Sequence, residues 1–242
     1  MVAITLFSGV QLLSIWIISE YIARIYDETK RRPEYIIDKK ITGIVSNSVS
    51  NIIKFNENLG NEVYIISYFN VQNMNEGIVE DFLNAKKNED MLSDVLKTLN
   101  INSKILSKNI SELSTSEKIK LLIVNALLKN YEVIYFDNIL PCLDSSSRTK
   151  LYKLIIKLKK FQNKTILISD INIDNIFEFV DNLIIVSDTI INGNKYDVFP
   201  CDIINNPITL TLRDKILENK NIDIGKVDSV NELIKAIYRE IR

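Results

Sequence analysis

Short runs rich in β-branched and aromatic residues alternate along this chain with longer amphipathic stretches. The β-rich runs are ITGIV (41–45), VYIISYF (63–69), VIYFD (133–137), TILIS (165–169) and NLIIVS (182–187). Helical periodicity covers 77–99, 116–130 and 147–160. This alternation predicts an α/β fold in which helices cover a mainly parallel sheet. Ligands of such sheets bind beyond the carboxyl ends of the strands, so functional residues should follow the strands directly.

The composition excludes several kinds of protein. Hydrophobic residues make up 46% and charged residues 25% of the 242 positions, which is typical of a globular chain. The net charge is −1, so nucleic acid is not indicated as a partner. There is no histidine, and the two cysteines, Cys142 and Cys201, lack CxxC spacing. Neither a histidine-containing zinc site nor a Ser-His-Asp or Cys-His active site is therefore expected.

Residues 1–19 carry no charged side chain and approach the ~20 apolar residues that a helix needs to cross a bilayer. This run is a candidate transmembrane helix. Basic residues follow it instead of preceding it, which argues against a cleaved signal peptide and predicts an inner or cytoplasmic membrane with the carboxyl side in the cytoplasm. A buried core helix is the alternative, because Gln11, Ser14 and Ser19 dilute the run.

Three regions are expected along the chain. Pro33 should end the helical pattern that follows the apolar run, which predicts a boundary near residues 33–40. The regions are a membrane anchor with a juxtamembrane tail at 1–37, an α/β domain at 40–200 and an extension at 201–242. The stretch 229–242 is predicted to be an amphipathic terminal helix that packs on the domain.

The stretch GVQLLSIWIISEYIARIYDETKRRPEYII, residues 9–37, resembles the C-terminal membrane helix and cytoplasmic tail of polyprenyl-phosphate glycosyltransferases. That family loads a sugar onto a lipid carrier. Its nucleotide-sugar domain and its metal-binding acidic motif would lie before Met1, so the resemblance implies membrane attachment and no glycosyl transfer.

Three short motifs follow one another in residues 110–169. Residues 113–117 read LSTSE, Asp137 ends the strand VIYFD, and residues 142–144 read CLD. Asp137 lies 24 positions after Leu113, and Asp144 lies seven positions after Asp137. This order and spacing resembles the ATPase of ATP-binding cassette (ABC) transporters, from its signature LSGGQ through its Walker B strand to its D-loop. The resemblance implies a P-loop NTPase-like fold and Mg-ATP as the cofactor.

The signature departs from the family pattern. In the family, its glycines let a helix N-terminus press against the γ-phosphate of a nucleotide held by the opposite subunit. Thr115 and Ser116 replace both glycines. Ser114 keeps a hydroxyl that can donate to phosphate, and Asp144 is carried over as the D-loop residue. The alternative is that Ser114 and Ser116 only cap the helix 117–130.

The catalytic positions are altered as well. Asn138 replaces the catalytic glutamate that activates the attacking water, and the loss of a general base should slow hydrolysis by about 10²–10⁴-fold. Ile171 replaces the switch histidine and cannot donate to the γ-phosphate. Asp137 keeps the capacity to bind Mg²⁺ through water, and the alternative is a polar residue at a strand end.

The phosphate-binding loop departs furthest from the family. Residues 41–54 read ITGIVSNSVSNIIK where a family member reads ITGI-x-GPNGSGKST. Ile52 replaces the phosphate-binding lysine, and Lys54, two positions later, is a weak substitute. Gln72 is the candidate glutamine of the Q-loop. The positions of the predicted degenerate P-loop are Gly43, Ser46, Ser48, Ser50 and Ile52.

These resemblances predict a membrane-tethered, ABC ATP-binding subunit with a degenerate nucleotide site, which acts as a non-hydrolysing partner or regulatory subunit. Binding of Mg-ATP is expected to be weak or absent. The expected partners are the membrane, a second ABC subunit and the membrane domain of a transporter. Two alternatives stay open: a weakly active ABC ATPase, and a fusion remnant of a glycosyltransferase tail and an ATPase, linked to lipid-carrier sugar transfer or export.

Overall fold

The computed structural model describes residues 11, 14–20, 22, 40–162 and 164–240, and it divides the chain into two units, Met1–Ile36 and Ile37–Arg242. Residues 14–20 of the first unit are helical. No helix within the described ranges is long and apolar enough to cross a membrane. Most of the predicted anchor at 1–19, most of the glycosyltransferase-like stretch and Pro33 lie outside these ranges, so those assignments stay predictions.

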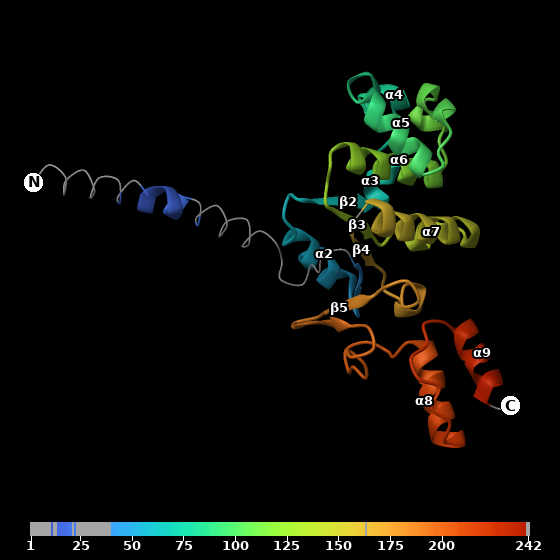
Figure 1. Cartoon of the computed structure of the whole chain (residues 1–242). Helices are drawn as coiled ribbons and strands as arrows, with labels where there is room; N and C mark the ends of the chain where they lie inside the picture. Colours follow the sequence, from blue (N-terminus) through green and yellow to red (C-terminus); the bar gives the residue numbers. More distant parts are fainter. Residues whose placement is uncertain (1–10, 12–13, 21, 23–39, 163, 241–242) are drawn as a thin grey trace, which may run out of the picture. The chain divides into compact units, whose positions relative to one another are not determined.

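The second unit is built on a six-stranded sheet with the strand order β2-β3-β4-β1-β5-β6 (Figure 1). Neighbouring strands run parallel except β6, which pairs antiparallel with β5. The predicted mainly parallel sheet is therefore confirmed, whereas the exposed strand β6 has no hydrophobic alternation that predicts it. The strands are β1 (Ile41–Ser46), β2 (Val63–Ser67), β3 (Val133–Asp137), β4 (Thr165–Ser169), β5 (Asn182–Val186) and β6 (Ile190–Asn194).

Helices connect successive strands as far as β5, whereas residues 187–189 join β5 directly to β6 (Figure 1). The predicted stretch 77–99 forms two α-helices instead of one, because Asn84 between them takes a left-handed backbone conformation with a φ of 48°. The α-helices of this unit are α2 (Val49–Glu57), α3 (Tyr68–Gln72), α4 (Val79–Phe82), α5 (Glu89–Thr98), α6 (Thr115–Leu128), α7 (Ser145–Gln162), α8 (Ile208–Lys220) and α9 (Val230–Glu240).

Strand β2 ends two residues earlier than the run VYIISYF predicts. The Ser67 hydroxyl accepts a hydrogen bond from the backbone N–H of Asn70 at 3.2 Å, and this cap starts the short helix α3. Tyr68 and Phe69 are therefore helical, and Phe69 is 73% exposed. A local capping hydrogen bond overrides the β-propensity of these two aromatic residues.

The central strands are buried on both of their faces. Every residue of β1, β4 and β5 is buried, which is typical of parallel strands covered on both sides. Ile44, Phe136 and Leu158 are among the side chains that are inaccessible to solvent. Because β3, β4 and β1 are parallel neighbours, their carboxyl ends lie at one edge of the sheet.

A buried lysine links the C-terminal extension to the α/β domain through an ion pair. Lys195, which is 5% exposed, forms an ion pair with Asp228 at 2.6 Å and donates to the carbonyl of Phe177 at 3.0 Å. The Tyr196 hydroxyl also donates to Asp228. An unpaired ammonium group would be costly to bury, so Asp228 ties the segment before α9 to the end of β6.

Gly43 lies in the interior of β1, where a side chain has no room. A Cβ atom at this position would lie 2.8 Å from Leu183 Cδ2, 2.9 Å from Ile176 Cδ1 and 3.1 Å from Val180 Cγ1. The glycine therefore allows β5 and the turn after β4 to pack closely on β1. Packing alone accounts for this residue, which the sequence comparison placed in the degenerate P-loop.

Replacing Gly43 by alanine should lower the free energy of unfolding by about 1–3 kcal/mol, because overpacking forces the neighbouring side chains to shift. Unfolding in guanidinium chloride measures the change. The matched control is Gly193→Ala in the edge strand β6, where a Cβ atom would meet only Val198 Cγ2, at 3.2 Å. Gly193→Ala should lower the free energy of unfolding by less than Gly43→Ala does. Equal decreases in the two variants would contradict the packing role of Gly43.

Candidate functional site

Polar residues follow three adjacent strands at the carboxyl edge of the sheet. Asn47 follows β1, Asn138 follows β3 and Asp170 follows β4. This is the edge at which parallel α/β sheets bind their ligands. A ligand site of this sheet is therefore expected around these strand ends.

The connection between β1 and α2 consists of only Asn47 and Ser48. Ser48 caps α2 by accepting the backbone N–H of Ser50 at 3.3 Å, and the two hydroxyl oxygens lie 2.7 Å apart. The Ser46 hydroxyl donates to the carbonyl of Val186 at 2.6 Å. A P-loop surrounds phosphate with a longer run of backbone amides. The serines of the predicted P-loop instead make contacts within the protein.

Residues 46–53, which lead into and form the start of α2, include no lysine or arginine that could pair with a phosphate at this helix N-terminus. Ile52, at the position of the phosphate-binding lysine, is 4% exposed and belongs to the core. Lys54 lies in the last turn of α2 and is exposed. The residues that face solvent near the start of the helix include Val49 and Ile53, which are apolar.

Asp137 is held by three hydrogen bonds from protein groups. Asn56 Nδ2 donates to Oδ2 at 3.0 Å, and the hydroxyls of Tyr135 and Ser169 donate to Oδ1 at 3.2 and 3.0 Å. Burial, together with the nearby charge of Asp137, raises the pKa of Tyr135, so its hydroxyl stays protonated as a donor. One carboxylate thus joins α2, β3 and β4.

The three residues that donate hydrogen bonds to Asp137 differ in whether their position beside it can be inferred from the sequence. Tyr135 lies two positions before Asp137 and therefore on the same face of the strand, and Ser169 ends the predicted strand TILIS. Asn56 comes from α2, and only the packing of that helix on the sheet brings it to Asp137. No group of three or more His, Cys, Asp or Glu in the described ranges is placed to hold a metal ion. Magnesium binding by Asp137 therefore stays a prediction.

Asn138 has a left-handed backbone conformation, with a φ of 46°. Asparagine adopts this conformation more readily than most residues. Its backbone N–H donates to Ser169 Oγ at 2.9 Å, and its Oδ1 is buried with no hydrogen-bond partner among the described residues. The turn after β3 thus accounts for an asparagine at this position.

Asp170 and Ile171, which follow β4, have opposite surroundings. Asp170 is 2% exposed and accepts hydrogen bonds from the Asn172 backbone N–H at 2.8 Å and from Asn175 Nδ2 at 3.0 Å. Burial raises the pKa of the Asp170 carboxyl. Ile171 is 46% exposed. Ile171, which the resemblance places at the switch histidine, therefore presents no polar group to the solvent.

Ser114 and Glu117 form a capping box at the start of α6. The Ser114 hydroxyl accepts the Glu117 backbone N–H at 3.3 Å, and the Ser114 backbone N–H donates to Glu117 Oε2 at 2.9 Å. The Ser114 hydroxyl also donates to the same Oε2 at 2.7 Å. These hydrogen bonds, led by the one from the Ser114 backbone, lower the pKa of Glu117. Ser114 is the cap residue, as the structural alternative predicts, and the helix begins at Thr115 instead of at residue 117.

Asp144 and Gln72 lie on the surface. Asp144 Oδ1 accepts the backbone N–H of Ser147 at 2.6 Å at the start of α7, and this bond lowers the pKa of Asp144. Gln72 is the last residue of α3 and is exposed. The hydrogen-bond donors to Asp137 include neither of them, nor Ser114. Asp137 is therefore hydrogen-bonded to Asn56, Tyr135 and Ser169, and these are not predicted site residues.

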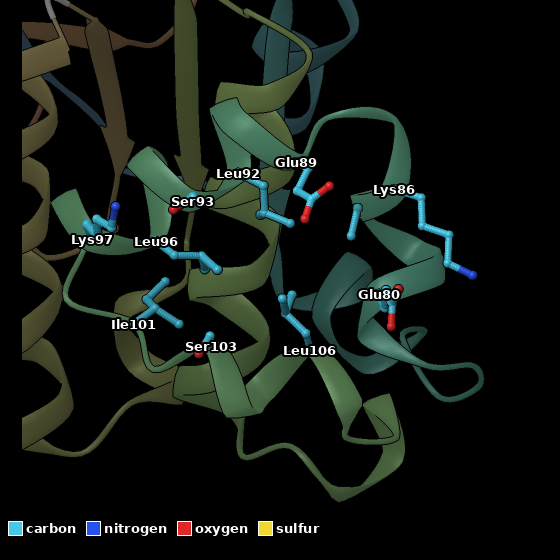
Figure 2. Close-up of a pocket in the computed structure, with 11 residues that line it drawn as sticks. Glu80, Lys86, Glu89, Leu92, Ser93, Leu96, Lys97, Ile101, Ser103 and Leu106 are labelled. Atoms are coloured by element: carbon cyan, nitrogen blue, oxygen red, sulfur yellow. The ribbon is translucent and has the colours of Figure 1, made fainter.

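A separate hollow of about 490 Å³ lies among α4, α5 and the 3₁₀ helix Ser103–Ser107 (Figure 2). Leu92, Leu96 and Leu106 point into it, whereas the Lys86 side chain points away. None of the residues that line this hollow is a predicted site residue.

This strand order, with a signature-like helix start, an aspartate at the end of β3 and a D-loop-like turn after it, is the P-loop NTPase-like fold of ABC ATPases. The fold matches cbiO1 of Clostridium perfringens, part of the ABC transporter complex cbiONQ, with a TM-score of 0.56 and 19% identity over 76% of this chain and 85% of that chain. It also matches a nucleotide-free ATP-binding cassette from an ABC transporter, with a TM-score of 0.54 and 17% identity over 66% and 82%.

The amino-acid sequence is similar to ABC transporter ATP-binding proteins, although no protein-family model matches it. It is 33% identical over 135 residues to the zinc import ATP-binding protein ZnuC of Ehrlichia chaffeensis, which covers 53% of this chain and 54% of ZnuC. It is 26% identical over 216 residues to the energy-coupling factor transporter ATP-binding protein EcfA1 of Fusobacterium nucleatum, covering 88% and 76%. The chain spans about half the length of the ZnuC proteins from Ehrlichia chaffeensis and Ehrlichia canis, 54% and 45%. The predicted resemblance to an ABC transporter ATPase domain is confirmed.

Replacing Asp137 by alanine should lower the free energy of unfolding by about 2–3 kcal/mol, because Asn56, Tyr135 and Ser169 lose their shared acceptor. Denaturant unfolding with EDTA and with magnesium chloride measures this loss, which should be the same in both. Asp188→Ala is the control, since Asp188 is an exposed aspartate outside this network. A loss that appears only with magnesium would show that Asp137 acts as a metal ligand instead.

Replacing Ser114 by alanine should cost about 1 kcal/mol of stability at neutral pH through loss of the helix cap. Folding lowers the pKa of Glu117, so the charged carboxylate stabilises the folded state. This stabilisation is fully present above the ordinary pKa of about 4.3, and it is lost as the pH falls through the lower pKa of the folded state. The difference between the variant and the wild type should therefore narrow in acid. Ser116→Ala, which leaves the capping box intact, is the control, and an equal loss in it would contradict the capping role.

Proposed function

We propose that this chain is an ABC-transporter cassette subunit that acts through its partners and does not hydrolyse ATP. The observation that carries the proposal is the two-residue connection between β1 and α2, which is followed by the buried Ile52. A nucleotide-hydrolysing cassette needs a loop of amides and a lysine at this point.

The residues at this edge do not fit Mg-ATP. The amides of the predicted P-loop serve the start of a helix, and Asp137 already accepts hydrogen bonds from three protein donors. Asn138 supplies no general base, and Ile171 supplies no donor for a γ-phosphate. On this proposal, the phosphate-binding loop is lacking after β1, the general base after β3 and the donor to the γ-phosphate after β4.

We infer that this chain keeps the surface by which two cassettes meet. Paired cassettes build composite nucleotide sites from the P-loop of one subunit and the signature of the other. Ser114 at the start of α6 and Asp144 at the start of α7 are both exposed. We propose that they face the nucleotide of an active partner cassette, within a transporter that also contains a membrane domain.

The apolar run at 1–19 supports a membrane tether for this subunit. On this proposal, the α/β domain acts at the cytoplasmic face of the membrane. Co-purification from membranes in detergent, with identification of the bound proteins, should yield a second cassette and a membrane domain. Recovery of the chain in the soluble fraction without a cassette partner would contradict this arrangement.

Purified full-length chain should release phosphate from ATP at the background rate, with or without magnesium, because it lacks both the phosphate cradle and a general base. Millimolar Mg-ATP should leave its melting temperature unchanged, since a ligand raises stability only to the extent that it binds the folded state. Asp137→Ala is measured in parallel. Magnesium-dependent turnover by the wild type that disappears in this variant would refute the proposal.

A further inference from the structure

The helix α7 concentrates positive charge on a chain whose net charge is only −1 (Figure 1). It spans 18 residues and contains no aspartate or glutamate. The side chains of Leu151, Leu154, Ile155 and Leu158 are buried, so one side of the helix packs on the domain and the other faces solvent. The basic residues of α7 are Arg148, Lys150, Lys153, Lys157, Lys159 and Lys160.

Three of these lysines form a row on the solvent side of α7. Lys150, Lys153 and Lys157 have the spacing i, i+3 and i+7, which places them on one face of an α-helix. Lys150 and Lys153 are exposed, and Lys157 is half-buried. The ion pairs within the described part of the chain include none of the three. The row is about 10 Å long at the helical rise per residue.

Two other basic residues of α7 are already used within the protein. Arg148 Nε donates to the carbonyls of Leu140 and Leu143 at 2.8 and 2.9 Å. Lys159 forms an ion pair with Asp181 at 2.6 Å. The row of three lysines is thus distinct from the cations that stabilise the fold.

The charges around the row leave it positive. Lys120 of α6 lines the same small hollow between α6 and α7 as Lys150, so positive charge extends onto the neighbouring helix. Asp144, which precedes α7, brings one negative charge near Lys150. The pKa of Asp144 is lowered mainly by the hydrogen bond from the Ser147 backbone N–H and less by Lys150. This carboxylate therefore offsets one cation at most.

The side chains among these lysines fit a lipid surface better than nucleic acid. Sites for single-stranded nucleic acid combine cations with exposed aromatic rings. Tyr152 of α7 is only 9% exposed, and its hydroxyl donates to the carbonyl of Asn175 at 2.6 Å. Ile156, three positions after Lys153, is 47% exposed. An apolar side chain beside lysines is typical of helices that lie at lipid headgroups.

We infer that the basic face of α7, formed by Lys150, Lys153, Ile156 and Lys157, contacts the headgroups of anionic phospholipids. Each lysine near an anionic bilayer strengthens binding about fivefold, so the three together contribute about 100-fold. Attraction of this size supplements a membrane tether and does not replace one. The inference rests on the proposed function in one respect, which is that the tether holds the α/β domain near the bilayer.

Partition of the full-length chain onto vesicles tests this contact. Vesicles of phosphatidylcholine with one-third phosphatidylserine are compared with vesicles of phosphatidylcholine alone, and cosedimentation gives the ratio of the two partition coefficients. The triple variant Lys150→Gln, Lys153→Gln and Lys157→Gln should lower this ratio about 100-fold. About 1 M sodium chloride should remove the preference of the wild type for the anionic vesicles, because salt screens exposed charges.

The matched control removes three exposed lysines from other elements of the same unit and should leave the ratio nearly unchanged. It carries Lys86→Gln, Lys104→Gln and Lys215→Gln. Equal partition of the wild type onto both kinds of vesicle would overturn the inference. An equal decrease of the ratio in both triple variants would also overturn it, because the preference would then reflect the charge of the whole surface.

A duplex DNA oligonucleotide is titrated in parallel. Loss of DNA binding in the α7 variant, with an unchanged vesicle ratio, would assign the basic face to nucleic acid and overturn the inference. These outcomes leave the proposed function intact. Magnesium-dependent ATP turnover would contradict the proposed function without affecting the lipid contact.

Discussion

Strand β1 pairs with β4 on one side and with β5 on the other, and the second unit depends on this central position. All six residues of β1 are buried, and Gly43 lets the side chains of Ile176, Val180 and Leu183 approach its backbone closely. Because these strands are parallel, the same pairing aligns the carboxyl ends of β3, β4 and β1. That alignment decides where Asp137, which ends β3, and the residues after each strand lie.

At this edge, the carboxylate of Asp137 serves as an internal acceptor. Its oxygens receive hydrogen bonds from a helix and from two strands, so the group contributes to cohesion without any ligand. The serines beside the β1–α2 connection are also used within the protein, since Ser48 caps α2 and Ser46, the last residue of β1, donates to the carbonyl of Val186 in β5. Both features stabilise this edge of the sheet through contacts within the protein.

Several parts of the site follow from the sequence. Ser114, with Glu117 three positions later, carries the capping-box pattern and caps α6 in the structure. The burial of Ile52, which the resemblance places at the P-loop lysine, agrees with an amphipathic helix at 49–57. Neither the sequence pattern nor the resemblance identifies Asn56 as a partner of Asp137, since 81 positions separate them. A cleft of about 800 Å³ likewise unites residues 45–47, 171–174 and 200–206, which no motif connects.

Local pattern was enough to predict the alternation of strands and helices and the mainly parallel sheet, because both depend on side-chain periodicity. Strand ends shifted where one side-chain hydrogen bond, such as that of Ser67, outweighed propensity. Tertiary packing alone decided which donors meet Asp137 and which side chains crowd position 43. Those outcomes depend on distances between segments far apart in the chain, and such distances are set only when the helices pack on the sheet.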